Sequence, residues 1–394
     1  MRVAIVGGKL QGVEAAYLAQ KAGWEVILID KDKTVPAARL CDSFRCLDVT
    51  RQDELVKVLN KCELIIPAFE NKEALASLLL SSQLTGIPML YDDGAYSISS
   101  SKIRSNRLFA DLGVPAPVPW PKCGFPVIVK PSDASGSEGV LKIRNQSELN
   151  LQKTLLKENH PWVIEEYLEG PSYSIEVIGF AGQYKAMQVT ELQMDGNYDC
   201  KRVLAPARLE RGLKKQFVET ALKIARKLQL NGIMDVEAIL HKGQLKVIEI
   251  DARLPSQTPT VVYKSTGLNM LQIIGEAFAK GQPWKAFEIE DNRGVVYEHI
   301  NVFPYRMEIS GEHIMAGAEN LQLCNGLFGA DEVITDYIPG KKHWVATLIV
   351  TGKNRQEAWN KRCQVIQRIR EEMGISSYLD TSPYEKSLFE LRSM

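Results

Sequence analysis

Strand-like and helix-like patterns of apolar residues alternate over the first quarter of the chain. Residues 2–6 (RVAIV) form a continuous apolar run, the turn GGKLQG follows, and VEAAYLAQKAG carries apolar residues at helical spacing up to Gly23. The runs WEVILID, CELIIPA and IPMLYDD repeat the strand pattern, and ALASLLLSSQL lies between the last two as a helix. This alternation predicts a Rossmann-like domain with a parallel sheet over residues 1–92.

The rest of the chain contains shorter and more mixed elements. Strands at FPVIVKP, LKIR, WVIEE, SIEVIG and AMQVTELQM precede the loop DGNYDCKRVLAPA and the amphipathic helix LKKQFVETALKIARKLQLNG. We expect a second domain over residues 93–290, with a lid subdomain at about residues 120–165. Residues 291–394 add the strands GVVYEHINVF and HWVATLIVTG, a charged helix and, from residue 376, a polar tail. The predicted fold class is α/β at the N-terminus and α+β overall.

A predicted β-hairpin near the middle of the chain carries an unusual number of carboxylates. The strands MDVEAIL and LKVIEID flank a glycine-containing turn. With a three-residue loop, 242–244, Glu237 lies opposite Glu249 and Asp235 lies opposite Asp251, whereas a two-residue loop would put the two pairs on opposite faces. Facing carboxylates repel each other, so a cation is expected between them. Oxygen ligands favour a hard cation such as Mg²⁺, which usually arrives with nucleotide phosphate; the alternative is a solvated charged face.

Charge and cysteine content narrow the possible partners. The chain has 394 residues with 48 basic and 48 acidic side chains, so no net field attracts it to nucleic acid or to a membrane surface. Its seven cysteines include no CxxC pair, which predicts reduced thiols in the cytoplasm. No apolar run approaches the ~20 residues that span a bilayer, and the start is not typical of a signal peptide. We therefore expect small-molecule substrates; the sequence does not indicate an oligomeric state.

The first glycine turn departs from the dinucleotide-binding fingerprint. Gly7 and Gly12 occupy the first and sixth positions, but Lys9 stands at the third, where a pyrophosphate would approach the backbone. Bound NAD is therefore not expected. Lys9 could instead contact a phosphate or carboxylate, and Asp30 lies where a ribose-binding acid would be, so both are candidate nucleotide contacts. The alternative is a scaffold that binds no nucleotide here.

A second group of residues is typical of a phosphate site. Lys102 lies at the start of a predicted helix, Lys130 ends a strand, and the loop SDASGSEGV can offer backbone N–H groups to phosphates. The following hinge, EEYLEG, can give its backbone groups to an adenine edge, while Glu169 can accept hydrogen bonds from ribose hydroxyls.

In order and spacing, these lysines, the glycine loop, the EEYLEG hinge and the acidic hairpin with its Glu249-x-Asp251-x-Arg253 sequence resemble the ATP-grasp fold. The usual signature has Asn where this chain has Asp251, which adds charge to the site. Within that superfamily, GGKLQG, GIMDVEAI and VIEIDARLPSQTPTVVY are similar to the ligases of pyrrolysine biosynthesis. That similarity extends to about residue 375.

The resemblance implies an ATP-dependent, ADP-forming ligase that joins the carboxylate of 3-methyl-D-ornithine to the side-chain amine of L-lysine, with ATP and Mg²⁺ as cofactors. It implies catalytic roles for Arg253 and Lys130, and phosphate contacts from Lys102 and Lys130. It also implies adenine contacts from the Glu166 and Leu168 backbone, a ribose contact from Glu169, and metal ligation by Glu237, Glu249 and Asp251. Methylornithine would be bound by Glu176, Asp235, Ser256, Gln257, Thr258 and Thr260, and lysine by Leu10, Gln11 and Glu70.

Three alternatives remain at this point. Another ATP-grasp amino-acid ligase or a purine-precursor carboxylase would use the same nucleotide residues. A non-catalytic ATP-binding module would keep the lysines and lose the metal acids, which this chain retains. An NAD-dependent oxidoreductase would use GGKLQG for its cofactor, but it leaves the acidic hairpin unexplained.

Overall fold

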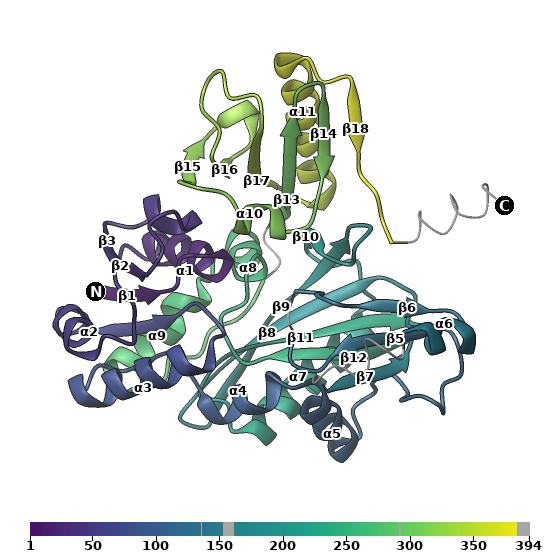
Figure 1. Ribbon diagram of the computed structural model, residues 1–394, viewed down its shortest axis with the longest axis horizontal. Coiled ribbons are helices and arrows are strands. Elements are labelled where there is room, and N and C mark those ends of the chain that lie inside the picture. Colours follow the sequence, from purple (N-terminus) through teal and green to yellow (C-terminus); the bar gives the residue numbers. More distant parts are fainter. Residues whose placement is uncertain (135, 153–160, 291–292, 384–394) are drawn as a thin grey trace.

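The computed structural model describes residues 1–134, 136–152, 161–290 and 293–383 (Figure 1). Its N-terminal part is a parallel sheet in the order β3-β2-β1-β4, as the alternating pattern predicts. The strands are β1 (Arg2–Val6), β2 (Glu25–Asp30), β3 (Ser43–Cys46) and β4 (Leu64–Pro67). The helices are α1 (Leu10–Lys21), η1 (Pro36–Arg39), α2 (Gln52–Leu59) and α3 (Lys72–Thr85). The predicted strand IPMLYDD is wrong: it makes only an isolated bridge from Met89 to Ile65, and Asp92 then caps α4.

The first glycine turn is tight because two backbone segments meet there. Gly7 has a φ of 102°, and a Cβ on Gly12 would lie 2.2 Å from the carbonyl oxygen of Gly7. Only residues without a side chain fit such an approach of helix to strand. Lys9 precedes α1 and its side chain is exposed, while Gly23 (φ 70°) follows the helix as predicted.

A small antiparallel sheet, β6-β5-β7, lies beyond the helices α4 (Asp93–Ser99) and α5 (Lys102–Leu112). Its strands are β5 (Val127–Pro131), β6 (Leu141–Ile143) and β7 (Trp162–Glu166), with helix α6 (Gln146–Leu151) after β6. Val127, Val129, Ile143 and Leu149 form a separate small core for this unit. It falls within the predicted lid region; Ser135 of the glycine loop and residues 153–160 lie outside the described residues.

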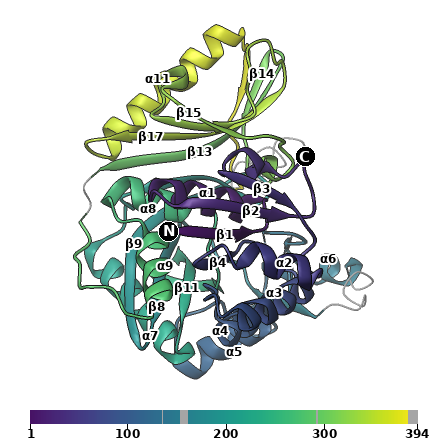
Figure 2. The same cartoon turned by 90° about the vertical axis from the view of Figure 1, so that its left-hand side faces the viewer.

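An eleven-stranded, largely antiparallel sheet forms the rest of the molecule, in the order β12-β11-β8-β9-β10-β13-β17-β16-β15, with β14 attached to β13 and β18 attached to β14. Its strands are β8 (Ser172–Phe180), β9 (Gln183–Met194), β10 (Cys200–Ala205), β11 (Gly232–His241), β12 (Gln244–Asp251), β13 (Gly294–Phe303), β14 (Arg306–Ile309), β15 (Gln322–Asn325), β16 (Glu332–Thr335), β17 (Trp344–Gly352) and β18 (Ser377–Leu379). The helices are α7 (Arg211–Leu228), α8 (Thr258–Thr266), α9 (Met270–Lys280), α10 (His313–Ala316) and α11 (Arg355–Met373), with a short turn η3 (Leu327–Gly329). Figure 2 shows α11 covering the β13 and β17 end of this sheet, while the N-terminal sheet lies beneath it.

Two features of this sheet differ from expectation. The segment DGNYDCKRVLAPA, predicted as a loop, contains β10, which pairs with β9 on one side and β13 on the other. The sheet therefore runs across the predicted boundary at residue 290. The predicted polar tail also begins with a strand, β18, which pairs with β14. None of the helices in the described part of the chain is both long and apolar enough to cross a membrane.

Candidate active site

The acidic hairpin has the predicted pairing of carboxylates, which it forms with a two-residue loop and a bulge. Its loop has two residues, Lys242 and Gly243, both with positive φ (49° and 81°). The expectation that a two-residue loop would put the two carboxylate pairs on opposite faces is wrong. A bulge at Ile248 adds one residue to β12 and restores the register. Asp235 thus faces Asp251, and Glu237 faces Glu249.

The neighbouring strand β8 extends these pairs into two rows. Glu176 lies opposite Asp235, so one row runs Glu176, Asp235, Asp251 across three strands. Ser174 lies opposite Glu237, so the second row runs Ser174, Glu237, Glu249. Because every second residue of a strand shares a face, both rows lie on the same side of the sheet.

Burial and mutual repulsion raise the free energy of the ionised carboxylates on this face when no cation is bound there. Burial, and then the charges of Glu249 and Asp251, raise the pKa of Glu237 to about 8. Burial likewise raises the pKa values of Asp235 and Asp251 well above the usual range, although Arg253 opposes the shift. Burial raises the pKa of Glu176 to about 7. The face therefore suits ligands that bring positive charge.

A cavity of about 440 Å³ lies over the second row, between the small sheet and the large one. It brings together Lys102, Lys130, Glu166, Leu168, Glu237 and Glu249, all of which the sequence predicts for nucleotide, phosphate or metal. Each lysine contacts a carboxylate: Lys102 Nζ is 2.6 Å from Glu249, and Lys130 Nζ is 2.7 Å from Glu165. The two cations are thereby held at the cavity wall.

The hinge residues divide into those that reach this cavity and one that does not. The Glu166 N–H donates to the Val118 carbonyl at 2.8 Å, and its carboxylate contacts Lys246, so neither group is open to a ligand. Leu168 lines the cavity. Glu169 is exposed and does not line it, and its N–H donates to His241 Nδ1 at 3.0 Å.

A second cavity, of about 680 Å³, opens at the carboxyl ends of the N-terminal strands. Leu10, Gln11 and Glu70 line it, as expected for the lysine residues. Lys9 and Asp30 line it too, and Asp30 accepts a hydrogen bond from the Gly8 N–H at 2.8 Å. This placement separates Lys9 and Asp30 from the other predicted nucleotide contacts.

A narrower space of about 100 Å³ lies between the two cavities. Its lining includes Glu237 and Glu249, shared with the first cavity, and Arg253 and Ser256, shared with the second. Asp235, Asp251, Gln257 and Thr258 complete the predicted residues found here. Glu176 and Thr260 are buried but are not among the lining residues.

Sequence reasoning missed Glu312, a half-buried acid that lines this space, and Glu14, a buried acid that contacts α8 beside it. Glu312 accepts hydrogen bonds from Ser256 Oγ (2.6 Å) and Gln257 Nε2 (2.8 Å). Glu14, on α1, accepts from the Thr260 N–H at 2.6 Å and so ties the N-terminal domain to α8. Neither acid stands in a motif, and no sequence signal could have found them. Glu165, the first residue of the predicted hinge EEYLEG, was given no role of its own.

Comparisons with known proteins show the family of this chain. A family model described as an ATP-grasp domain matches residues 99–257, and one described as a PylC-like N-terminal domain matches residues 3–90. The 3-methyl-D-ornithine–L-lysine ligase of Methanosarcina mazei is 35% identical over 379 residues, covering 95% of this chain and 97% of the relative. The chain belongs to this ligase family. It is accordingly an ATP-grasp ligase, and the alternatives of an NAD-dependent oxidoreductase and of a non-catalytic ATP-binding module are set aside.

Solved structures of more distant proteins share the fold of this chain. The biotin carboxylase domain of Hydrogenobacter thermophilus 2-oxoglutarate carboxylase, in complex with MgADP, ADP and bicarbonate, gives a TM-score of 0.72 at 17% identity over 93% of this chain and 89% of that one. An ADP complex of N5-carboxyaminoimidazole ribonucleotide synthetase gives 0.69 at 16% identity over 95% of this chain and 97% of that one. The ATP-grasp fold predicted from the sequence is confirmed.

Proposed function

We propose that this ligase joins the carboxylate of 3-methyl-D-ornithine to the side-chain amine of L-lysine, in the cytoplasm, with cleavage of ATP to ADP and phosphate. The observation that carries the proposal is the position of the two carboxylate rows. They lie where the lysine-lined cavity and the N-terminal cavity approach each other, with Arg253 in the space between. A reaction that needs a phosphoryl donor, an acid and an amine in line would use three such adjoining spaces.

ATP is assigned to the first cavity. Lys102 and Lys130 would contact its phosphates, and the cavity at Leu168 would take the adenine. For Glu166, only the carbonyl is left as a candidate adenine contact. The ribose contact of Glu169 stays a prediction, as do nucleotide contacts of Lys9 and Asp30.

Mg²⁺ fits the hairpin on the chemistry of its donors. Glu237 and Glu249 face each other at the border of two cavities and offer carboxylate oxygens, the ligands that Mg²⁺ prefers. The raised pKa of Glu237 indicates that these acids lack compensating charge. Asp251 would complete the set, although it already contacts Arg253. When bound, the ion would neutralise charge on the transferring phosphoryl group.

The methylornithine site is supported by buried polar atoms that lack partners. Glu176 Oε2, Asp235 Oδ1 and Gln257 Oε1 are buried and have no hydrogen-bond partner in the described part of the chain. Such atoms are costly unless a ligand satisfies them. Two acids and an amide oxygen suit the ammonium groups of a diamino acid, and Ser256, Thr258 and Thr260 supply hydroxyls nearby.

Lysine is assigned to the second cavity, with Leu10 and Gln11 at its wall. Glu70 is the acid there, and it is not the cap of α3, because Asn71 accepts the capping hydrogen bond from the Ala74 N–H. The carboxylate instead contacts Arg253 and Gln11. A lysine ammonium would find a negative group already oriented toward the reaction centre.

The chain's own residues bind and orient the reactants. A carboxylate oxygen of methylornithine attacks the γ-phosphorus of ATP, which breaks the bond to ADP and gives an acyl phosphate; Lys130 and Arg253 would face the transferred group. The lysine amine then attacks the acyl carbon, the bond to phosphate oxygen breaks, and an amide and phosphate result. Of the two protons lost by the original ammonium, one leaves with the phosphate and one is released.

Mass spectrometry of the products tests this assignment. The chain is incubated with ATP, Mg²⁺, L-lysine and D-ornithine or 3-methyl-D-ornithine, with ¹⁸O in the carboxylate. We expect an amide of the two amino acids and one ¹⁸O atom in the phosphate. Formation of AMP and pyrophosphate would exclude the acyl phosphate, and products from other amino acids or from bicarbonate alone would exclude these substrates.

A further inference from the structure

The C-terminal segment beyond α11 returns to the nucleotide cavity. Strand β18 pairs with β14, and the chain continues through Asp380 and Thr381 to Ser382 and Pro383, which line the cavity with Lys102 and Lys201. This wall comes from a part of the sequence that none of the predicted motifs includes.

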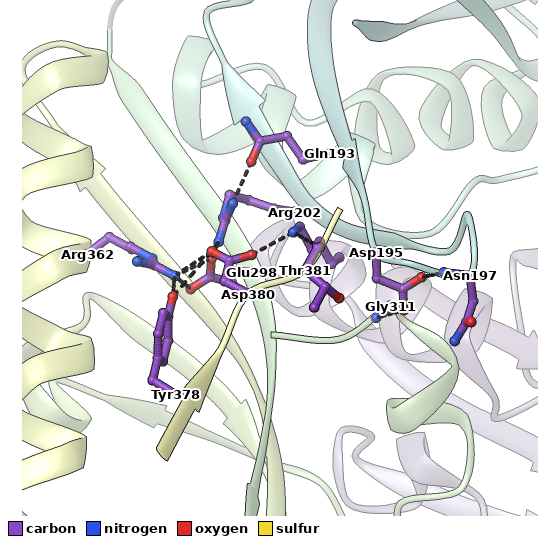
Figure 3. Close-up of polar contacts among 11 residues, drawn as sticks. Gln193, Asp195, Asn197, Arg202, Glu298, Gly311, Arg362, Tyr378, Asp380 and Thr381 are labelled. Atoms are coloured by element: carbon purple, nitrogen blue, oxygen red, sulfur yellow. Dashed lines mark hydrogen bonds and ion pairs between the residues drawn. The ribbon is translucent and has the colours of Figure 1, made fainter. Parts of the chain in front are cut away.

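Asp380 anchors the segment by accepting hydrogen bonds from two adjacent basic residues of β10, Lys201 and Arg202. Figure 3 shows Asp380 beside Arg202. Its Oδ1 is 2.6 Å from Lys201 Nζ, and its Oδ2 is 2.7 Å from Arg202 Nη2. Neighbouring side chains of a regular strand point to opposite faces. Here Lys201 is the extra residue of a β-bulge against β9, which allows both side chains to reach one carboxylate.

The anchor is part of a buried charge cluster. Glu298 lies opposite Arg202 on β13 and contacts both Arg202 and Arg362, while the Tyr378 hydroxyl donates to Asp380. Although burial opposes it, the charges of Arg202 and Lys201 hold the pKa of Asp380 down to about 2. Asp380 therefore keeps its negative charge near neutral pH. Together with Glu298 it compensates the three cations of the cluster, Lys201, Arg202 and Arg362.

Lys201 is oriented by this arrangement toward the cavity. Its side chain is only 5% exposed, and its ammonium donates to Asp380 and to the Thr381 carbonyl. An ammonium has three N–H donors, and within the described residues the Lys201 ammonium uses two of them, which leaves one for a ligand oxygen. We propose that Asp380 is a positioning residue of the nucleotide site: it fixes Lys201 toward the phosphates and holds residues 381–383 as a wall of the cavity. The proposal rests on the assignment of this cavity to ATP.

Calorimetric titration with AMP-PNP and Mg²⁺ tests the proposal on full-length variants. We expect Asp380→Asn, which keeps an oxygen acceptor but loses the charge, to raise the nucleotide Kd by about 10-fold, the scale of one charge-assisted contact. The KM for ATP should rise with it, and the KM for each amino acid should change by less than about twofold. Lys201→Met should weaken binding to a similar degree, and the double variant should be no weaker than Lys201→Met alone, because both changes remove one interaction.

Tyr378→Phe is the matched control for a merely structural role. It removes a hydroxyl from the same cluster on the side away from the cavity, so it should lower Tm while leaving the nucleotide Kd within about twofold. Unchanged or tighter binding by Asp380→Asn, additive losses in the double variant, or an equal loss in Tyr378→Phe would overturn the proposal. If Asp380→Asn does not fold, an unchanged Kd for Lys201→Met overturns it as well. Failure of the wild-type chain to bind AMP-PNP would instead refute the ATP assignment itself.

Discussion

Arg253 of the hairpin segment forms an ion pair with Glu70 of the N-terminal domain, with Nε 2.6 Å from Oε1. The same guanidinium contacts Asp251 at 3.1 Å, and these carboxylates raise the pKa of Arg253 against the opposing effect of burial. Gln11 also donates to Glu70, at 2.9 Å. One chain of contacts thus links the proposed metal ligands to the proposed lysine site.

Glu70→Ala should impair lysine use more than ATP use. Loss of a charge-assisted contact of about 1.5–3 kcal/mol predicts a rise of roughly 10-fold or more in the KM for lysine. The kcat should fall as well, because Arg253 loses a partner, while the KM for ATP stays nearly constant. Steady-state kinetics with each substrate varied in turn measure these effects. Glu54→Ala is the control, because Glu54 is an exposed acid of α2. An unaltered KM for lysine in Glu70→Ala would show that Glu70 has only a structural role.

Glu249→Gln should lower kcat on the order of 10²-fold with the fold intact. The change removes a proposed ligand and a charge, and it also removes the acid that contacts Lys102. The loss of repulsion with Glu237 should offset the loss of the ion pair with Lys102, so Tm should change little. Turnover measured against Mg²⁺ concentration, with Glu249→Asp as the variant that keeps the charge, provides the test. Wild-type turnover in Glu249→Gln at saturating Mg²⁺ would refute metal ligation.

Lys130→Met should destabilise the chain as well as inactivate it. Glu165 is buried and would lose its cation, while the hydrogen bond from Asn106 at 3.0 Å would remain. Leaving such a charge unpaired costs about 3–5 kcal/mol. The double variant Lys130→Met/Glu165→Gln should recover much of that stability in urea unfolding but remain inactive. Recovery of activity along with stability would show that Lys130 only compensates Glu165.

Glu14 should make stability fall as pH rises. Burial raises its pKa in the folded chain from 4.5 to about 8, so the folded state holds this proton more tightly than the unfolded state. The stabilisation is complete below pH 4.5 and is lost as pH rises through 8. At about 1.4 kcal/mol per pKa unit the total is on the order of 5 kcal/mol.

Glu14→Gln should remove this pH-dependent contribution to the free energy of unfolding. The amide oxygen of the new side chain can still accept the hydrogen bond from the Thr260 N–H. Relative to wild type, we expect it to be more stable at pH 8 than at pH 5 by about 2–4 kcal/mol, measured by urea unfolding. The exposed change Glu219→Gln on α7 serves as the control. An identical pH dependence in wild type and Glu14→Gln would show that the acid does not titrate in this range.

Local patterns determined much of the architecture and the list of candidate residues. The alternation of apolar runs and helical spacing predicted β1, α1, β2, β4 and α3, because each depends on a period along a single segment. The motifs assigned Lys102 and Lys130 to phosphates and Glu237 and Glu249 to a metal ion, and all four line one cavity. The acidic pairing could be anticipated too, since the alternation of side chains in a strand leaves only two registers.

Only the tertiary structure decided how these pieces meet. The bulge at Ile248 sets the hairpin register, and no local signal marks it, because a bulge is stabilised by the strands on either side. Likewise, Glu70 resembles a helix-start acid in sequence and contacts Arg253 in space, more than 180 residues away. Glu312 and Asp380 belong to no motif, yet they hold Gln257 and Lys201. Such contacts depend on packing between distant segments, and periodicity along the chain carries no information about which distant side chain will neutralise a buried charge.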